Sequence, residues 1–137
     1  MAWGRTRDES LARLRRALAE LGTGRGGCVV VEGSAGIGKT KFLEHVADQA
    51  QREGVRVQRG RATELDSSLP LAALRGMFRT AGGTGVGPLF RVRRDGEVHD
   101  LVEEVVARIA DWAGGRPALV ALDDAHWVDE VTAHVLR

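Results

Sequence analysis

The sequence predicts an α/β fold in which helices cover both faces of a parallel sheet. Two apolar runs, Cys28–Glu32 and Pro117–Asp124, are short and typical of buried strands. Segments with helical periodicity lie between them, and alternation of strand and helix along a chain favours a parallel sheet. A glycine-rich segment directly follows the first run, where we expect the strand to turn into a helix.

The spacing of apolar residues predicts the elements of the first half in order. Regularly spaced leucines predict a helix over 10–21 with Ser10 as its N-cap, followed by a glycine-rich connector, Gly22–Gly27. After the strand Cys28–Glu32 and its loop, residues 39–52 carry apolar side chains on one helical face. Val55–Arg59 alternates apolar and polar residues, which predicts a second strand.

The second half is less regular. Pro70 suits the first turn of a helix whose apolar side chains are Leu71, Leu74, Met77 and Phe78. Residues 82–96 are rich in glycine and predict a loop, whereas 97–113 show helical periodicity. The third strand, Pro117–Asp124, is followed by the beginning of a helix over 129–137.

Composition excludes several classes of protein. The 137 residues are 43% hydrophobic and 28% charged, and their apolar stretches are far too short to cross a bilayer, so no membrane partner is expected. The single cysteine cannot form an internal disulfide, which favours the reducing cytoplasm. The net charge of +1 argues against non-specific nucleic-acid binding, and we expect no direct nucleic-acid contact from this segment.

The segment 33–40 carries the clearest chemical signal. It matches G-x-x-x-x-G-K-[ST], the loop whose backbone N–H groups surround nucleotide phosphates. Lys39 is expected to reach the β and γ phosphates, and the hydroxyl of Thr40 to bind Mg²⁺. The candidate nucleotide-binding residues are Gly33, Ser34, Ala35, Gly36, Ile37, Gly38, Lys39 and Thr40. Residues 22–27 also match G-x-G-x-x-G, but they precede a strand, so we interpret them as a linker.

The third predicted strand ends in two carboxylates. Residues 119–124 are four apolar residues followed by Asp123 and Asp124, which is the Walker B arrangement of P-loop ATPases. The first acid of such a pair emerges beside the metal, so Asp123 is expected to bind Mg²⁺. The second can deprotonate the attacking water, which makes Asp124 the candidate catalytic base.

These two segments suggest a family. Residues 31–40 together with Leu122–Asp129 resemble the AAA-type ATPase domain of large ATP-binding LuxR-family transcriptional regulators and related STAND signal-transduction ATPases. The Asp-Asp-x-His-Trp-x-Asp string is the more specific half, and Gly60-Arg61 and Leu69-Pro70-Leu71 also fall where the family places related residues. The resemblance implies specificity for ATP, a regulatory switch, and oligomerisation in an intact protein.

The resemblance also implies a partial domain. In the family the domain continues past the Walker B strand with a sensor strand and a helical lid, and one later strand lies between the two motif strands. We therefore expect residues 1–27 to form a helix and linker, and 28–137 a three-layer P-loop NTPase domain truncated after the Walker B strand. Alone, the chain is expected to fold marginally and to hydrolyse ATP poorly or not at all.

Other functions compete with this interpretation. A small-molecule P-loop kinase would need a basic lid, which Arg91, Arg93 and Arg94 could imitate, and a non-hydrolysing ATP-binding fragment is a further alternative. A GTPase is disfavoured because no Asn-Lys-x-Asp guanine-reading string occurs in the chain. A DNA-loading ATPase lacks support because the acidic end, with a charge of −3 over 117–137, would repel phosphate.

Overall fold

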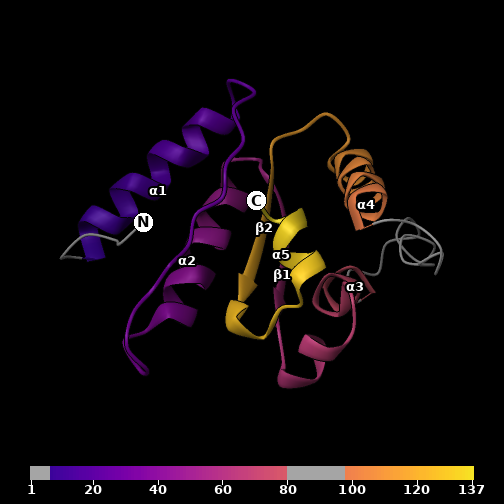
Figure 1. Ribbon diagram of the computed structural model, residues 1–137. Helices are drawn as coiled ribbons and strands as arrows, with labels where there is room; N and C mark the ends of the chain where they lie inside the picture. Colours follow the sequence, from indigo (N-terminus) through magenta and orange to yellow (C-terminus); the bar gives the residue numbers. More distant parts are fainter. Residues whose placement is uncertain (1–6, 80–97) are drawn as a thin grey trace. The chain divides into compact units, whose positions relative to one another are not determined.

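The computed structural model describes residues 7–79 and 98–137. The helices, shown in Figure 1, are α1 (Arg7–Leu21), α2 (Lys39–Arg52), α3 (Ala72–Arg79), α4 (Val98–Ala113) and α5 (Glu130–Val135). The strands are β1 (Arg56–Arg61) and β2 (Ala118–Asp123), and the 3₁₀ turns that follow them are η1 (Glu64–Ser68) and η2 (Ala125–Trp127).

The two strands pair with each other in a two-stranded sheet. The amide of Arg56 donates to the carbonyl oxygen of Pro117 at 2.8 Å, and the amide of Ala62 donates to that of Asp123 at 3.0 Å. In both bonds the two residues are separated by 61 positions in the sequence (56 with 117 and 62 with 123). Residue numbers therefore increase in the same direction along both strands, which means that the strands are parallel. The register brings Arg61, at the end of β1, beside the end of β2.

The chain divides into two compact units. The first comprises Met1–Val57 with Pro117–Leu119, and the second comprises Gln58–Arg116 with Val120–Arg137. The predicted phosphate loop therefore belongs to the first unit, and the acidic end of β2 belongs to the second.

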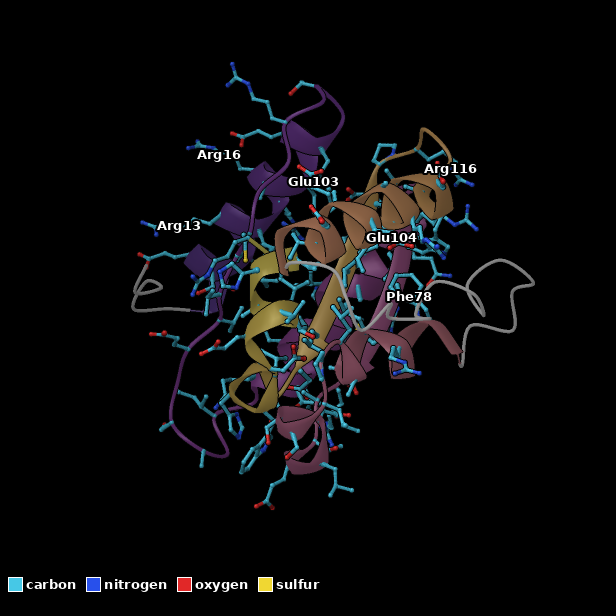
Figure 2. All side chains as sticks on the ribbon, turned by 45° about the vertical axis from the view of Figure 1, so that its right-hand side comes forward. Arg13, Arg16, Phe78, Glu103, Glu104 and Arg116 are labelled. Carbon is cyan, nitrogen blue, oxygen red and sulfur yellow. The ribbon has the colours of Figure 1, made fainter. Side chains whose placement is uncertain are left out.

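The first unit is centred on the apolar faces of α1 and α2. Three buried side chains form a cluster and three partly buried ones pack against it: Leu18, Ala50 and Val55, then Leu21, Val57 and Leu119. The other face of α1 is polar, and Arg13 and Arg16 extend outward from it (Figure 2). This division into two faces is what an amphipathic surface helix requires.

Helix α2 follows the phosphate loop, and glycines bound it on both sides. Gly38 is its N-cap, with a left-handed φ of 95°, and Gly54 follows its end with φ 83°. Between them, Phe42, Val46, Ala47 and Ala50 share one buried face.

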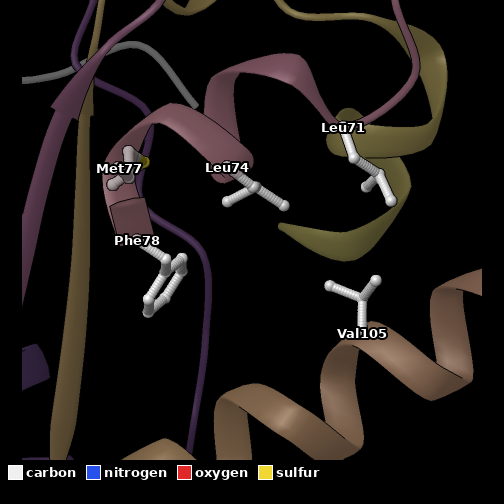
Figure 3. Close-up of a cluster of buried hydrophobic side chains, with 5 residues drawn as sticks. All are labelled: Leu71, Leu74, Met77, Phe78 and Val105. Atoms are coloured by element: carbon white, nitrogen blue, oxygen red, sulfur yellow. The ribbon is translucent and has the colours of Figure 1, made fainter. Parts of the chain in front are cut away.

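The second unit has its own apolar core between α3 and α4. The cluster consists of Leu71, Leu74, Met77, Phe78 and Val105. Figure 3 shows the side chains of Leu71 and Leu74 pointing toward Val105, which rises from α4. The ring of Phe78 also meets that of Trp112 edge to face, with centroids 5.3 Å apart. This core supports β2, because Val120 and Leu122 pack against it.

Most of the predicted elements are confirmed with small shifts in their bounds. The helices over 39–52 and 97–113 correspond to α2 and α4, and the strands Val55–Arg59 and Pro117–Asp124 to β1 and β2. Ser10 is not an N-cap, because α1 begins at Arg7. The expected helix over 129–137 is shorter, with Asp129 as the N-cap of α5.

One predicted strand is wrong. Residues 25–34 have no regular secondary structure, so Cys28–Glu32 is not a strand in the described part of the chain. A parallel strand needs hydrogen bonds from a neighbouring strand, and within residues 7–79 and 98–137 β1 and β2 pair only with each other. Val29 and Val30 are consequently exposed, by 39% and 51%.

The predicted three-layer sheet is likewise not complete among residues 7–79 and 98–137, where the sheet has two strands. The loop predicted over 82–96, with the arginines at 91, 93 and 94, lies outside the described residues.

Candidate functional site

Three glycines shape the phosphate loop, for two different reasons. Gly36 and Gly38 have φ of 78° and 95°, in the left-handed region that L-residues with a side chain rarely adopt. Gly33 has no such angle, but a Cβ added there would lie 2.9 Å from Cγ2 of Ile37. Glycine therefore suits this path at all three positions, and a side chain at any of them would strain the backbone or displace Ile37.

Lys39 extends back along the loop that precedes it. Its Nζ donates to the carbonyl oxygens of Gly33 at 2.7 Å and Ser34 at 2.9 Å. An ammonium group has three N–H donors, so these two bonds leave capacity for one further acceptor, such as a phosphate oxygen. The positive charge is thus held at the loop by contacts with its own backbone.

The N-terminus of α2 adds donors to the same place. The first intrahelical bond runs from the amide of Phe42 to the carbonyl of Gly38, at 3.0 Å. Amides in the first turn of a helix point along its axis toward the N-terminal end, so those at the start of α2 are directed toward the loop. The helix dipole favours an anion at this end. Ile37 is 67% exposed, so the loop is open to a ligand. An exposed loop beside the positive end of a helix dipole fits the phosphates of a nucleoside triphosphate.

The acidic pair ends β2 in a sharp change of backbone direction. Asp123 is the last residue of the strand, and Asp124 has a left-handed φ of 53°. The amide of Asp124 donates to Oδ1 of Asp123 at 2.9 Å, which fixes the first carboxylate against the turn. The side chain of Asp123 is 13% exposed and that of Asp124 is 41% exposed. The two candidate site residues therefore differ in access to water.

Arg61 joins both carboxylates. Its Nη2 lies 3.0 Å from Oδ2 of Asp123, and its Nε lies 3.4 Å from Oδ2 of Asp124. Sequence reasoning gave this arginine no role beyond a position shared with the family. Only the parallel register of β1 and β2, which local patterns do not specify, brings residue 61 to residue 123.

The last aspartate of the Asp-Asp-x-His-Trp-x-Asp string is structural. Asp129 is 8% exposed and caps α5 by accepting a hydrogen bond from the amide of Thr132 at 3.0 Å. Its Oδ2 also accepts from the Thr132 hydroxyl and, at 3.0 Å, from the amide of Leu71. Leu71 has a φ of 61°, an unusual angle for a bulky residue. Asp129 therefore ties the segment after β2 to the entry of α3.

The predicted magnesium ligands are chemically suitable. Thr40 offers a hydroxyl and Asp123 a carboxylate, and Mg²⁺ prefers such oxygen donors together with phosphate oxygens and water. No three His, Cys, Asp or Glu side chains gather into a metal cage in the described residues. An ion held mainly by phosphates and water does not require one. Because Thr40 and Asp123 belong to different units, their joint use of one ion stays a prediction.

Both motif segments lie within one match to a known family. Residues 5–137 match the model of the AAA ATPase domain. This chain belongs to the AAA ATPase domain family. Membership implies the α/β fold of P-loop ATPases and indicates a nucleotide-binding domain of the ATPase type, and domains of this kind generally use ATP and Mg²⁺.

Neither the curated proteins nor the solved structures contain a match to the chain. Within the described ranges, every helix is too short or too polar for a transmembrane span.

Proposed function

We propose that this AAA ATPase domain binds MgATP and serves as the nucleotide-dependent switch of a LuxR-type transcriptional regulator. The geometry of residues 33–40 carries the proposal, because left-handed glycines, a lysine and a helix N-terminus occur together in one short segment and suit an anion. The string Leu122–Asp129 is the basis of the narrower assignment, since its sequence resembles that of LuxR-type regulators.

Each candidate residue has a distinct part in this scheme. Backbone amides of residues 33–40 and the Lys39 ammonium would bind the phosphates, and Thr40 and Asp123 would hold Mg²⁺. The magnesium ion would neutralise charge on the phosphate oxygens. Asp124 would accept a proton from the attacking water, and its greater exposure to solvent is consistent with that part.

ATP would act as a switch by favouring one conformation of the domain over another. A ligand shifts such an equilibrium only through different contacts in the two states.

Replacing Lys39 by alanine tests the proposal most directly. Lys39→Ala should weaken MgATP binding by at least a hundredfold in isothermal titration calorimetry, because the variant lacks the charge that the loop holds in place. Lys41→Ala is the matched control, since it removes an exposed lysine two residues further along α2. Equal affinity in wild type and Lys39→Ala would refute the proposal.

Asp124→Asn separates binding from hydrolysis. In a complete protein that contains this domain, the variant should bind MgATP within about twofold of wild type yet release phosphate at least tenfold more slowly in a single turnover, because an amide cannot accept the proton. Phosphate release at an unchanged rate would exclude Asp124 as the base.

A further inference from the structure

Arg61 occupies a position that the proposed chemistry leaves unexplained. It is the last residue of β1, and its guanidinium contacts both Asp123 and Asp124. The amide of Ala62, the next residue, donates to the carbonyl of Asp123, so the backbone holds this contact in register. The arginine therefore interacts with both the predicted metal ligand and the predicted base.

We propose that Arg61 is a positioning residue that holds this acidic pair and sets the magnesium concentration that the site requires. The inference rests on the proposed function of Asp123 as a magnesium ligand. Without a cation between them, two adjacent carboxylates repel each other, and the guanidinium removes that repulsion. It also holds Asp123 Oδ2 while the amide of Asp124 holds Oδ1, so both oxygens have fixed directions.

The same charge opposes a metal ion. Mg²⁺ at Asp123 would lie close to a guanidinium of like sign, and it would compete for the oxygen at 3.0 Å from Nη2. The side chain of Arg61 is 57% exposed, so solvent screening keeps the competition modest. We therefore expect Arg61 to raise the magnesium requirement by roughly fivefold without preventing binding.

The guanidinium has room to leave the carboxylates. A cavity of about 220 Å³ borders Arg61 in the second unit, and its other lining residues include Arg59, Asp66 and Gly76. Asp66 brings a negative charge to the wall of this cavity, where it accepts hydrogen bonds from Thr63. An arginine displaced by a metal ion can therefore turn toward another carboxylate, so its release is not blocked by packing.

The magnesium dependence of ATP binding tests the proposal. In Arg61→Gln and Arg61→Met, the Mg²⁺ concentration that gives half of the magnesium-dependent change in ATP affinity should be roughly fivefold lower than in wild type. The affinity for ATP in EDTA should stay unchanged. Arg61→Lys keeps the charge and should stay within twofold of wild type. Arg59→Gln is the matched control, because it removes an equal charge from an exposed position of the same strand. Equal magnesium requirements in wild type and both neutral variants would overturn the proposal, as would an equal shift in Arg59→Gln.

A metal titration without nucleotide separates this proposal from the proposed function. Mn²⁺ should broaden the amide resonances of Asp123 and Asp124 at lower concentration in Arg61→Gln and Arg61→Met than in wild type. A merely structural arginine would leave this concentration unchanged, and that result would overturn the proposal. If wild type binds no ATP with or without Mg²⁺, the proposed function fails, and the Mn²⁺ comparison still decides the role of Arg61.

Discussion

The phosphate loop at residues 33–40 and the acidic segment Asp123–Thr132 are held in place by different means. Backbone angles define the loop, through glycines at 36 and 38, and the ammonium group of Lys39 binds two of its own carbonyl oxygens. Side chains define the acidic segment, where Arg61 and Asp129 bind groups that are distant in sequence. The difference teaches that substitutions in the loop should affect ligand binding, whereas substitutions in the acidic segment should affect stability as well.

The largest effect is expected for Asp129→Ala. The variant loses three hydrogen bonds to a buried carboxylate, including the cap of α5 and the bond to Leu71, which should lower the free energy of unfolding by about 3 kcal/mol. Urea unfolding of the 137-residue chain measures the loss. Glu130→Ala, which removes the exposed acid next to it, should change stability by less than about 0.5 kcal/mol. A loss below about 1 kcal/mol for Asp129→Ala would show that the hydrogen bonds of its carboxylate do not stabilise the acidic segment.

A smaller loss of stability, with a clear loss of binding, is expected for Gly38→Ala. The left-handed φ of 95° should cost an alanine about 1 kcal/mol, and a shifted start of α2 should weaken MgATP binding by at least tenfold. Gly26→Ala is matched to it, because a Cβ at either position meets nothing within 4 Å and only Gly38 has a left-handed φ. If both variants bind alike, backbone angle does not shape the loop.

The smallest effect is expected ahead of the loop, for Val30→Ala. Val30 is 51% exposed, so truncating it should change the free energy of unfolding by less than about 0.5 kcal/mol. Val55→Ala, at a valine that is 8% exposed within the core of the same unit, should cost about 2 kcal/mol. A cost at Val30 as large as that at Val55 would mean that the segment is packed, and the contrast with the acidic segment would weaken.

Local patterns were sufficient to predict the helices and both paired strands. The apolar spacing of α2 and the glycines beside it specify that helix almost completely, because these signals act within a few residues. The motif spacing likewise located the candidate site residues, although their roles stay predictions. The three valines of Cys28–Val31 have the composition of a buried strand, but composition does not say whether a neighbouring strand is present to pair with them.

The contacts that local patterns missed are long-range. Asp129 reaches Leu71 across 58 positions, and Arg61 reaches Asp123 across 62. Neither pair has a spacing that a helix or a turn would impose, so only the packed structure brings the partners together. The unusual backbone angle of Leu71 belongs to the same class, because its cost is offset by a side chain far along the chain.

The parallel register of β1 and β2 has a consequence for how the chain folds. Each hydrogen bond between β1 and β2 closes a loop of about sixty residues. The chain therefore loses the conformational entropy of loop closure before the sheet forms any hydrogen bond. The helices can form within microseconds, whereas the ladder requires a long-range encounter. We therefore expect α2 to acquire protection from hydrogen exchange earlier in refolding than the two strands, and the acidic pair to meet its arginine last.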